Sequence, residues 1–322
     1  MSNNVSVVQD KKRYYIAMFC CVMGNFLWGF SYLLTRTAQQ YAIPAVQLSC
    51  RFLITFILMN IMLLFKPSLI SLKGKPIRHL VIIGFLMPVF YYLESSGVYY
   101  TNSSFASLCL SLVPVLTLIA GALFLKEYPS RRQTVFSFFP IAGVICITLA
   151  NSTMGSITSI GIFILAIACL VSTFNRILNR KWASDYSAFE RTYACFAAGA
   201  LVFTVVALIT VKGDLSVYMN ALKEPNFLIS TFLMAIFCSI AGNTLVNYSI
   251  IYLPVVKSAS IGTISSITAT VLGIVFLHEP INAISVIGST LAIIGIWQVT
   301  KVVPPKKSAE SSETLPAQAD GE

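Results

Sequence analysis

Ionisable side chains inside long apolar stretches are the residues of this sequence that could do chemistry. At a rise of about 1.5 Å per helical residue, Glu94 lies roughly 9 Å outward of the centre of the third stretch, and Arg51 roughly 6 Å outward of the centre of the second. Charges at such depths in a membrane are costly and are functional candidates by default. Glu94 could take up and release a proton, or bind the amine of a ligand. Because the two depths match, Glu94 and Arg51 could instead form a structural ion pair, and the sequence leaves these alternatives open.

Two further basic residues lie near the ends of apolar stretches. Lys257 begins the ninth stretch among small neighbours, so it could hold an anionic group such as a carboxylate. Its long side chain could equally reach water and anchor the helix end. Arg176 lies near the inner end of the sixth stretch, and we interpret it as an anchor of this kind.

Uncharged polar residues form stripes on two of the stretches. Tyr91 and Ser95 share one face of the third stretch with the carboxyl described above. Asn243 and Asn247 share one face of the eighth at the same helical spacing. The stripes predict a central ligand cavity between the two helices. The alternative is that these groups bond to one another and only hold the helices together.

The composition places these residues in a membrane protein. Of the 322 residues, 57% are hydrophobic and 11% are charged, whereas soluble domains carry about 25% charged residues. The net charge of +10 is therefore expected to orient the chain in a bilayer and not to bind nucleic acid. The eight cysteines lie in apolar stretches, the two histidines are too few for a histidine metal site, and the phosphate-binding glycine loop of ATPases is missing. We expect neither a metal nor a cofactor.

Ten stretches are each long enough to span a bilayer, whose core needs about 20 helical residues. Their approximate ranges are 14–35, 46–65, 78–99, 103–125, 133–151, 157–178, 188–211, 227–251, 255–277 and 283–302. Lys and Arg concentrate in alternate connections, on the side where both termini would lie. This distribution predicts a multi-pass protein of the plasma (inner) membrane with cytoplasmic N- and C-termini.

Two phrases 152 positions apart repeat each other: "VLTLIAGALFLKE" (115–127) and "ITATVLGIVFLHE" (267–279). The same shift maps the polar stripe of the third stretch onto that of the eighth. Each half holds five stretches, and because five is odd, the second half must cross the membrane upside down. The sequence thus predicts an all-α membrane protein with ten transmembrane helices in two inverted five-helix repeats. The expected parts are a cytoplasmic N-terminal tail (1–13), repeat 1 (14–151), repeat 2 (157–302) and a disordered cytoplasmic tail (303–322).

Three motifs point to a known family. They are the Trp-Gly pair in "NFLWGFSYLLTR" (25–36), the Pro and Arg-Phe of "IPAVQLSCRFLITF" (43–56), and "YYTNSSFASLCLSLVPVLTLIAGALFLKE" (99–127). With these motifs the chain, over about 14–302, resembles the EamA-type transporters of the drug/metabolite transporter superfamily. The resemblance implies a ten-helix transporter, often an exporter of amino acids or related small metabolites, commonly driven by ion gradients. Trp28 of the first motif would form an aromatic wall of the cavity, or would simply pack.

The residues and the resemblance together predict a secondary transporter and not an enzyme. We expect export of small metabolites by alternating access, with Glu94 as the titratable group of a proton-coupled cycle. The alternatives are an importer of a small metabolite, and a non-transporting regulatory membrane protein on a transporter fold. The expected partners are a small-molecule substrate, protons as coupling ion and the lipid bilayer, and the oligomeric state is not predicted.

Overall fold

The computed structural model describes residues 2–110, 112–125, 158–254, 264–277 and 283–300, with short pieces between 130 and 142 and between 257 and 262. Within these residues the chain is all-helical and has no strand. The predicted fifth span (133–151) lies mostly outside the described residues, and the predicted tail (303–322) lies wholly outside them.

Six of the described helices are long and apolar enough to cross a membrane, which confirms the prediction of a helical membrane protein. They are α1 (Ser2–Ala38, apolar from Lys12), α2 (Pro44–Phe65), α3 (Ile77–Tyr100), α7 (Ser159–Lys181), α8 (Ala188–Thr210) and the continuous helix formed by α10 (Pro225–Leu233), the π-helical segment η2 (Met234–Gly242) and α11 (Asn243–Tyr252). Shorter helices cover the predicted fourth, ninth and tenth spans: α4 (Ser103–Leu110), α5 (Val113–Phe124), α13 (Ile264–Leu277) and α14 (Ala283–Thr300). The count of ten spans stays a prediction.

Three local features differ from the predicted boundaries. The fourth stretch is divided between α4 and α5 just before Pro114, which takes one of the first two positions of α5, where its missing N–H leaves no bond unmade. A short helix, α9 (Ser216–Lys223), lies within the connection between the predicted seventh and eighth stretches. Finally, α1 begins at Ser2, so the segment 2–13 that was predicted as a tail continues the first helix.

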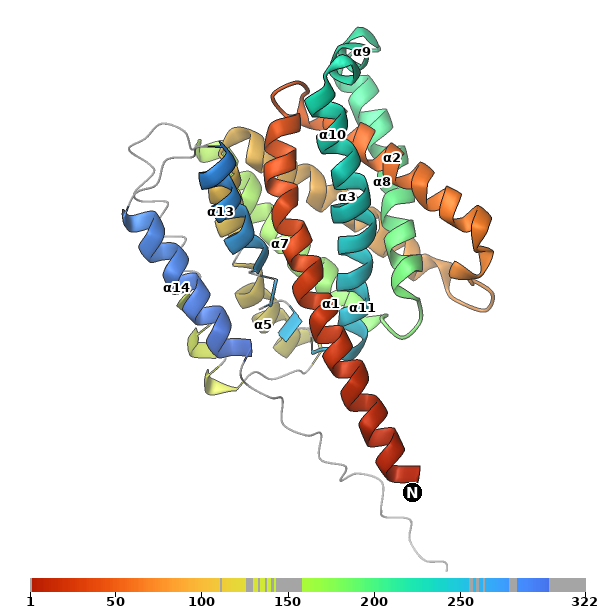
Figure 1. Cartoon of the computed structure of the whole chain (residues 1–322), viewed down its shortest axis with the longest axis vertical. Helices are drawn as coiled ribbons and strands as arrows, with labels where there is room; N and C mark the ends of the chain where they lie inside the picture. The colour runs from red at the N-terminus through yellow and green to blue at the C-terminus, as the bar shows by residue number, and fades with distance from the viewer. Residues whose placement is uncertain are drawn as a thin grey trace, which may run out of the picture.

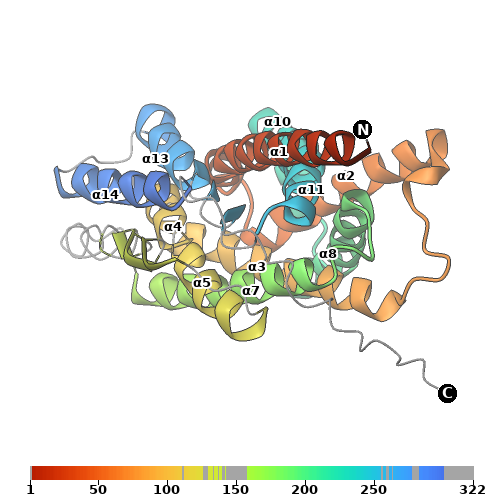
Figure 2. The same ribbon diagram turned by 90° about the horizontal axis from the view of Figure 1, so that it is seen from below.

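The helices pack into a bundle around α1 and α3. Figure 1 shows α1 running along the bundle, with α13 and α14 to one side of it and α2 and α8 to the other. Seen from below, α1, α10 and α13 lie on one side of the bundle and α3, α5 and α7 on the other (Figure 2). The most extensive contacts join α3 to α7 and α8, α2 to α8, and α1 to α13 and α11.

Glycines allow the closest helix contacts. At Gly199 in α8, an added Cβ would lie 2.2 Å from Cδ1 of Phe52 in α2. Phe52 is fully buried, and its ring contacts those of Tyr91, Phe196 and Phe203 at centroid distances of 4.7 to 5.3 Å. Small residues at helix interfaces permit this close approach. In hydrocarbon no hydrophobic effect draws helices together, so close van der Waals packing is one of the interactions that hold them.

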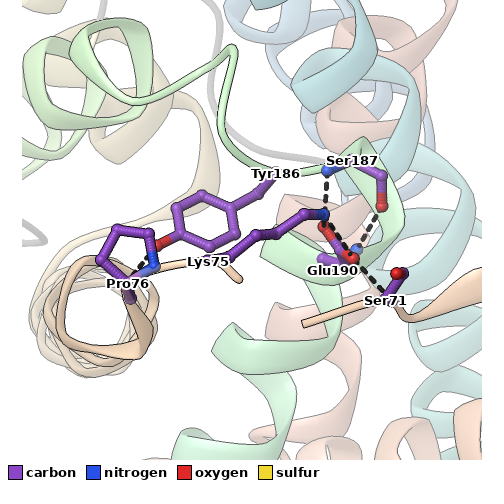
Figure 3. A network of polar contacts seen from close by, with 6 residues as sticks. All are labelled: Ser71, Lys75, Pro76, Tyr186, Ser187 and Glu190. Carbon is purple, nitrogen blue, oxygen red and sulfur yellow. Dashed lines mark hydrogen bonds and ion pairs between the residues drawn. The ribbon is translucent and has the colours of Figure 1, made fainter. Parts of the chain in front are cut away.

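A polar network ties the connection between α2 and α3 to the start of α8 (Figure 3). Ser187 and Glu190 form a capping box, with the Glu190 carboxylate accepting from the Ser187 N–H at 2.7 Å. The same carboxylate accepts from the Ser71 N–H at 2.8 Å and pairs with Nζ of Lys75 at 2.7 Å. The Tyr186 hydroxyl donates to the Pro76 carbonyl beside it. The buried carboxylate of Glu190 thus both caps the start of α8 and holds the α2–α3 connection against it.

The Gly199→Ala variant tests the close packing of α2 and α8. Because the Phe52 ring is enclosed by other rings, the added methyl should strain the interface by about 1–3 kcal/mol and lower the melting temperature in detergent. Leu201→Ala is the control, since Leu201 lies on the same helix and is 63% exposed. Equal melting temperatures for Gly199→Ala and the native protein would contradict this packing.

The Glu190→Gln variant tests the network at the α2–α3 connection. The amide loses the ion pair and turns an N–H₂ group toward the donors at Ser71 or Ser187, which should cost about 1–3 kcal/mol. We expect trypsin to cut faster at Lys73 in the variant than in the native protein. Asp214→Asn, a carboxyl-to-amide change at an exposed turn between α8 and α9, should leave cutting at Lys73 unchanged. Equal cutting of native and Glu190→Gln protein would show that the carboxylate does not hold this connection.

Candidate functional site

A cavity of about 980 Å³, which includes its opening to solvent, lies inside the bundle. Residues from α1, α2, α3, α4, α5, α7, α8, α11 and α13 line it. The predicted site residues that line it are Trp28, Arg51, Tyr91, Glu94, Asn243 and Asn247. Ser95 lines a smaller cavity of about 250 Å³, which shares Arg51, Tyr91 and Glu94 with the larger one. Lys257 lines neither.

Arg51 is held in place by neutral groups. Its Nε donates to the Ser239 hydroxyl at 2.9 Å, and its Nη1 donates to the Ser31 hydroxyl at 3.1 Å. The guanidinium lies 5.2 Å from the ring centroid of Tyr91. Its Nη2 is buried and has no hydrogen-bond partner among the described residues. Arg51 is therefore oriented by its neighbours but keeps its charge unneutralised.

Glu94 is half-buried in the cavity wall. Its carboxyl interacts with the Tyr32 hydroxyl of α1 and, more weakly, with the charge of Arg51. The ion pairs between described residues join Lys75 to Glu190 and His79 to Asp185, and none joins Arg51 to Glu94. Among the described residues, Arg51 thus bonds to serines and the Glu94 carboxyl forms no salt bridge, so the ion pair suggested by the matched depths is not formed here.

Tyr91 and Asn243 bring the two predicted polar stripes into contact. Asn243 Nδ2 donates to the Tyr91 hydroxyl at 2.9 Å, which joins α3 to α11. The π-helical segment η2 ends at Gly242, and Asn243 also donates to the Cys238 carbonyl of that segment at 3.3 Å. Members of both stripes line the cavity, and Tyr91 and Asn243 bond to each other. Binding of a ligand between the stripes stays a prediction.

Ser95 and Asn247, the other members of the stripes, each bond to a neighbouring helix or connection. Gln39 donates through Nε2 to the Ser95 carbonyl at 2.9 Å. Arg191 donates through Nη2 to the Asn247 carbonyl. Asn247 also donates to the Thr192 hydroxyl at 3.0 Å. Each pair closes a polar contact at one side of the cavity wall.

These contacts recur at fixed spacing along the chain. Gln39 and Arg191 are 152 positions apart, as are Ser95 and Asn247, so one carbonyl contact is the copy of the other. Tyr91 and Asn243, which bond to each other, are also 152 positions apart.

Lys257 lies apart from this cavity. It is buried, its Nζ donates to the Tyr14 hydroxyl of α1, and it lies 5.1 Å from the centroid of the Tyr14 ring. This arrangement is an aromatic contact between α1 and the segment that precedes α13. An anionic ligand at Lys257 stays an untested prediction.

Sequence reasoning missed several polar residues of the cavity. Arg191 was not singled out, although it is an ionisable residue inside a predicted span, and it is 1% exposed in the cavity wall. Arg176, interpreted above as an anchor, also lines the cavity. Asn175 and Asn179 line it from the same helix, at the i, i+4 spacing that was used for the other stripes. That spacing was the signal that could have found them.

The described residues hold no cluster of three or more His, Cys, Asp or Glu side chains that could bind a metal. The described cysteines are free and buried. Several of their thiols donate to helix carbonyls, as Cys238 does to Leu27 at 3.1 Å. Their placement is that of small buried side chains, as the sequence predicted.

Comparison with solved structures shows the fold. The chain is similar to a protein of known crystal structure, with a TM-score of 0.65 and 16% identity, over 88% of this chain and 96% of that one. At this level of identity the likeness concerns the arrangement of helices alone.

Comparison of sequences shows the family. The chain is 26% identical to the uncharacterized transporter YcxC of Bacillus subtilis, over 87% of this chain and 91% of that protein. It is 24% identical to the uncharacterized transporter YyaM of the same bacterium, over 94% and 99% of the two chains, and 22% identical to an uncharacterized transporter of Archaeoglobus fulgidus, over 85% and 95%. The EamA-like transporter family model matches twice, at residues 15–149 and 159–301. The chain therefore belongs to the EamA-like transporter family, as its motifs indicated.

Proposed function

We propose that this EamA-like transporter is a proton-coupled secondary transporter that exports small metabolites, such as amino acids or related compounds, by alternating access. The observation that carries the proposal is the recurrence of polar contacts 152 positions apart around one cavity. The family and the transporter names of the relatives support transport and not catalysis. The substrate, the direction and the coupling belong to the proposal.

The recurring contacts support two inverted repeats at 14–151 and 157–302. When two halves are related by a two-fold axis, residues near the axis meet their own equivalents. Tyr91 and Asn243 do so. The two family matches coincide with these halves. We accordingly propose ten transmembrane helices, with the N-terminal segment and the tail at 303–322 both in the cytoplasm of the cell and the protein in its plasma membrane.

The same symmetry suggests how the cavity could open to one side at a time. The Gln39–Ser95 contact and its copy, Arg191–Asn247, would lie toward opposite membrane faces, because the halves are inverted. Movement of α3 and α8 against α1 and α11 could break one of these contacts while the other persists. Substrate in the cavity would then meet the two sides of the membrane in turn.

Glu94 is the group proposed to carry the proton. It is the carboxyl among the described residues that line the cavity, and it has no ion pair that would hold it permanently charged. Its contact with Tyr32 couples it to α1, which packs against helices of both halves.

Metabolite profiling of cells tests the transport function. We expect cells with the native protein to release one or more metabolites that cells with an empty vector retain. Glu94→Gln cannot exchange a proton, so release should stop responding to the external pH. Asp214→Asn should behave as the native protein, because Asp214 lies in an exposed turn outside the cavity. Full release by Glu94→Gln with native pH dependence would exclude Glu94 as the proton carrier, and accumulation instead of release would indicate an importer.

Cysteine labelling tests the topology. Asp214 and Lys73 lie in exposed connections that the proposal places on opposite faces of the membrane. A membrane-impermeant maleimide should label Asp214→Cys in intact cells and Lys73→Cys only after permeabilisation. The native cysteines among the described residues are buried and should react little. The reverse labelling pattern would place the termini outside the cytoplasm and overturn the proposed orientation.

A further inference from the structure

We infer that the cavity binds a small organic dianion, a molecule whose two anionic groups are carboxylates or phosphates on a short carbon frame. The inference rests on the proposed function in one respect, since it takes the cavity to be the transport site. It is carried by the charges of the cavity wall and by the buried donors there that have no partner.

The charges of the wall are unbalanced. The charged residues that line the cavity are three arginines, Arg51, Arg176 and Arg191, and one titratable carboxyl, Glu94. Three positive charges thus face one negative charge. The ion pairs formed between described residues, Lys75–Glu190 and His79–Asp185, use other side chains. Buried charges need compensation, and two further negative charges would bring this cavity to neutrality.

Arg51 has the properties of a built anion site. It is 2% exposed, and serine hydroxyls fix its orientation without cancelling its charge. The Nη2 left without a partner is a charged donor that needs an acceptor. A guanidinium held in this way can present two parallel N–H groups to a carboxylate or a phosphate.

The other two arginines approach the cavity from different helices. Arg191 in α8 bonds to the carbonyls of Asn179 and Asn247, and its Nε is buried without a partner. Arg176 in α7 donates no hydrogen bond to a described residue. Guanidinium groups on three separate helices suit a ligand with two separated anionic ends better than one with a single charge.

The unpartnered polar atoms of the wall have the same character. Three buried atoms there lack a partner among the described residues, namely Trp28 Nε1, Arg51 Nη2 and Arg191 Nε. All three are N–H donors and cannot accept a hydrogen bond. An ionised carboxylate or phosphate offers acceptors only, which complements this set. An amine would bring further donors to a wall with one carboxyl to receive them.

The rest of the wall limits the frame of the ligand. Met87, Phe90, Val113 and Ile250 contribute apolar surface to the cavity. A short carbon chain between the two anionic groups can contact this surface while the charged ends reach the arginines.

Binding to the full-length protein in lipid nanodiscs tests the inference. The probes are succinate and glutarate as dicarboxylates, propane-1,3-bisphosphonate as a molecule with two phosphate-like groups, butyrate as a monoanion, alanine as a zwitterion and putrescine as a dication. We expect at least one molecule with two anionic groups to bind about tenfold or more tightly than butyrate, and alanine and putrescine to bind least. The comparison of glutarate with propane-1,3-bisphosphonate, whose anionic groups are separated by the same number of carbons, distinguishes the two anion chemistries.

Matched variants assign the binding to the cavity. Arg176→Gln, at a half-buried position that folding should tolerate, is expected to weaken dianion binding about tenfold or more. Arg78→Gln removes the same charge at an exposed position outside the cavity and should leave the affinity unchanged. Glu94→Gln removes a negative charge from the wall and should tighten dianion binding, whereas it would weaken the binding of an amine.

The outcomes separate this inference from the proposed function. Tighter binding of alanine or putrescine than of every dianion, or equal dianion affinity in Arg176→Gln and native protein, overturns the dianion site, and metabolite release can still establish transport. Failure of every dianion to bind the folded protein also overturns it. Dianion binding that Arg176→Gln abolishes, in a protein that releases no metabolite, supports the site and overturns the transport function.

Discussion

The hydrocarbon core of a bilayer offers no hydrogen-bond partners, so every polar group in this bundle depends on another part of the protein. Helices satisfy the backbone internally. Buried hydroxyls follow the same rule locally, as Thr55 does by donating to the Arg51 carbonyl at 2.7 Å and Thr192 to the Ala188 carbonyl at 2.9 Å. Against this background the donors without partners stand out, and those of Trp28, Arg51 and Arg191 gather in the wall of one cavity. Within the described chain, the buried nitrogen donors of the candidate site therefore lack the hydrogen-bond partners that the membrane cannot supply.

Packing and polar contacts depend on each other around Arg51. Phe52, its neighbour in α2, fills the space that Gly199 leaves in α8, and its ring lies against that of Tyr91. This packing places the Tyr91 ring beside the guanidinium and its hydroxyl beside Asn243. Apolar contacts therefore set the position of the polar groups that α2, α3 and α11 contribute to the site.

The sequence predicted the long helices well and the details of the site only in part. A long apolar stretch specifies a helix because no other structure satisfies its backbone in lipid. The division of the fourth stretch near Pro114 was not predicted, and a proline alone does not decide it, because α3 continues through Pro88. The π-helical segment at Met234–Gly242 could not be foreseen, because its geometry is set by contacts with neighbouring helices and not by its own composition. Six predicted residues line the cavity because depth and helical spacing can be read from a sequence.

The partners of the charged residues could not be predicted. Depth along a helix axis does not say which way a side chain points, so Glu94 was as plausible a partner for Arg51 as the serines it bonds to. Arg191 was not predicted as a site residue because it directly follows the capping box at the start of α8, where charged residues are common. Its role in the cavity wall depends on the carbonyls that orient it, and these cannot be read from the sequence.

The attachment of the α2–α3 connection to the start of α8 divides the bundle mechanically. Three helices are joined at one end by the Glu190 carboxylate and along their length by the contacts of α2 and α3 with α8. Such a group of helices has few internal degrees of freedom and is expected to move as a rigid body. Any large displacement must then occur at its boundary with the group built on α1, which Tyr91–Asn243 and the serines around Arg51 cross. The place where the two groups move against each other would thus be the ligand site itself, and a bound ligand would contact both moving groups.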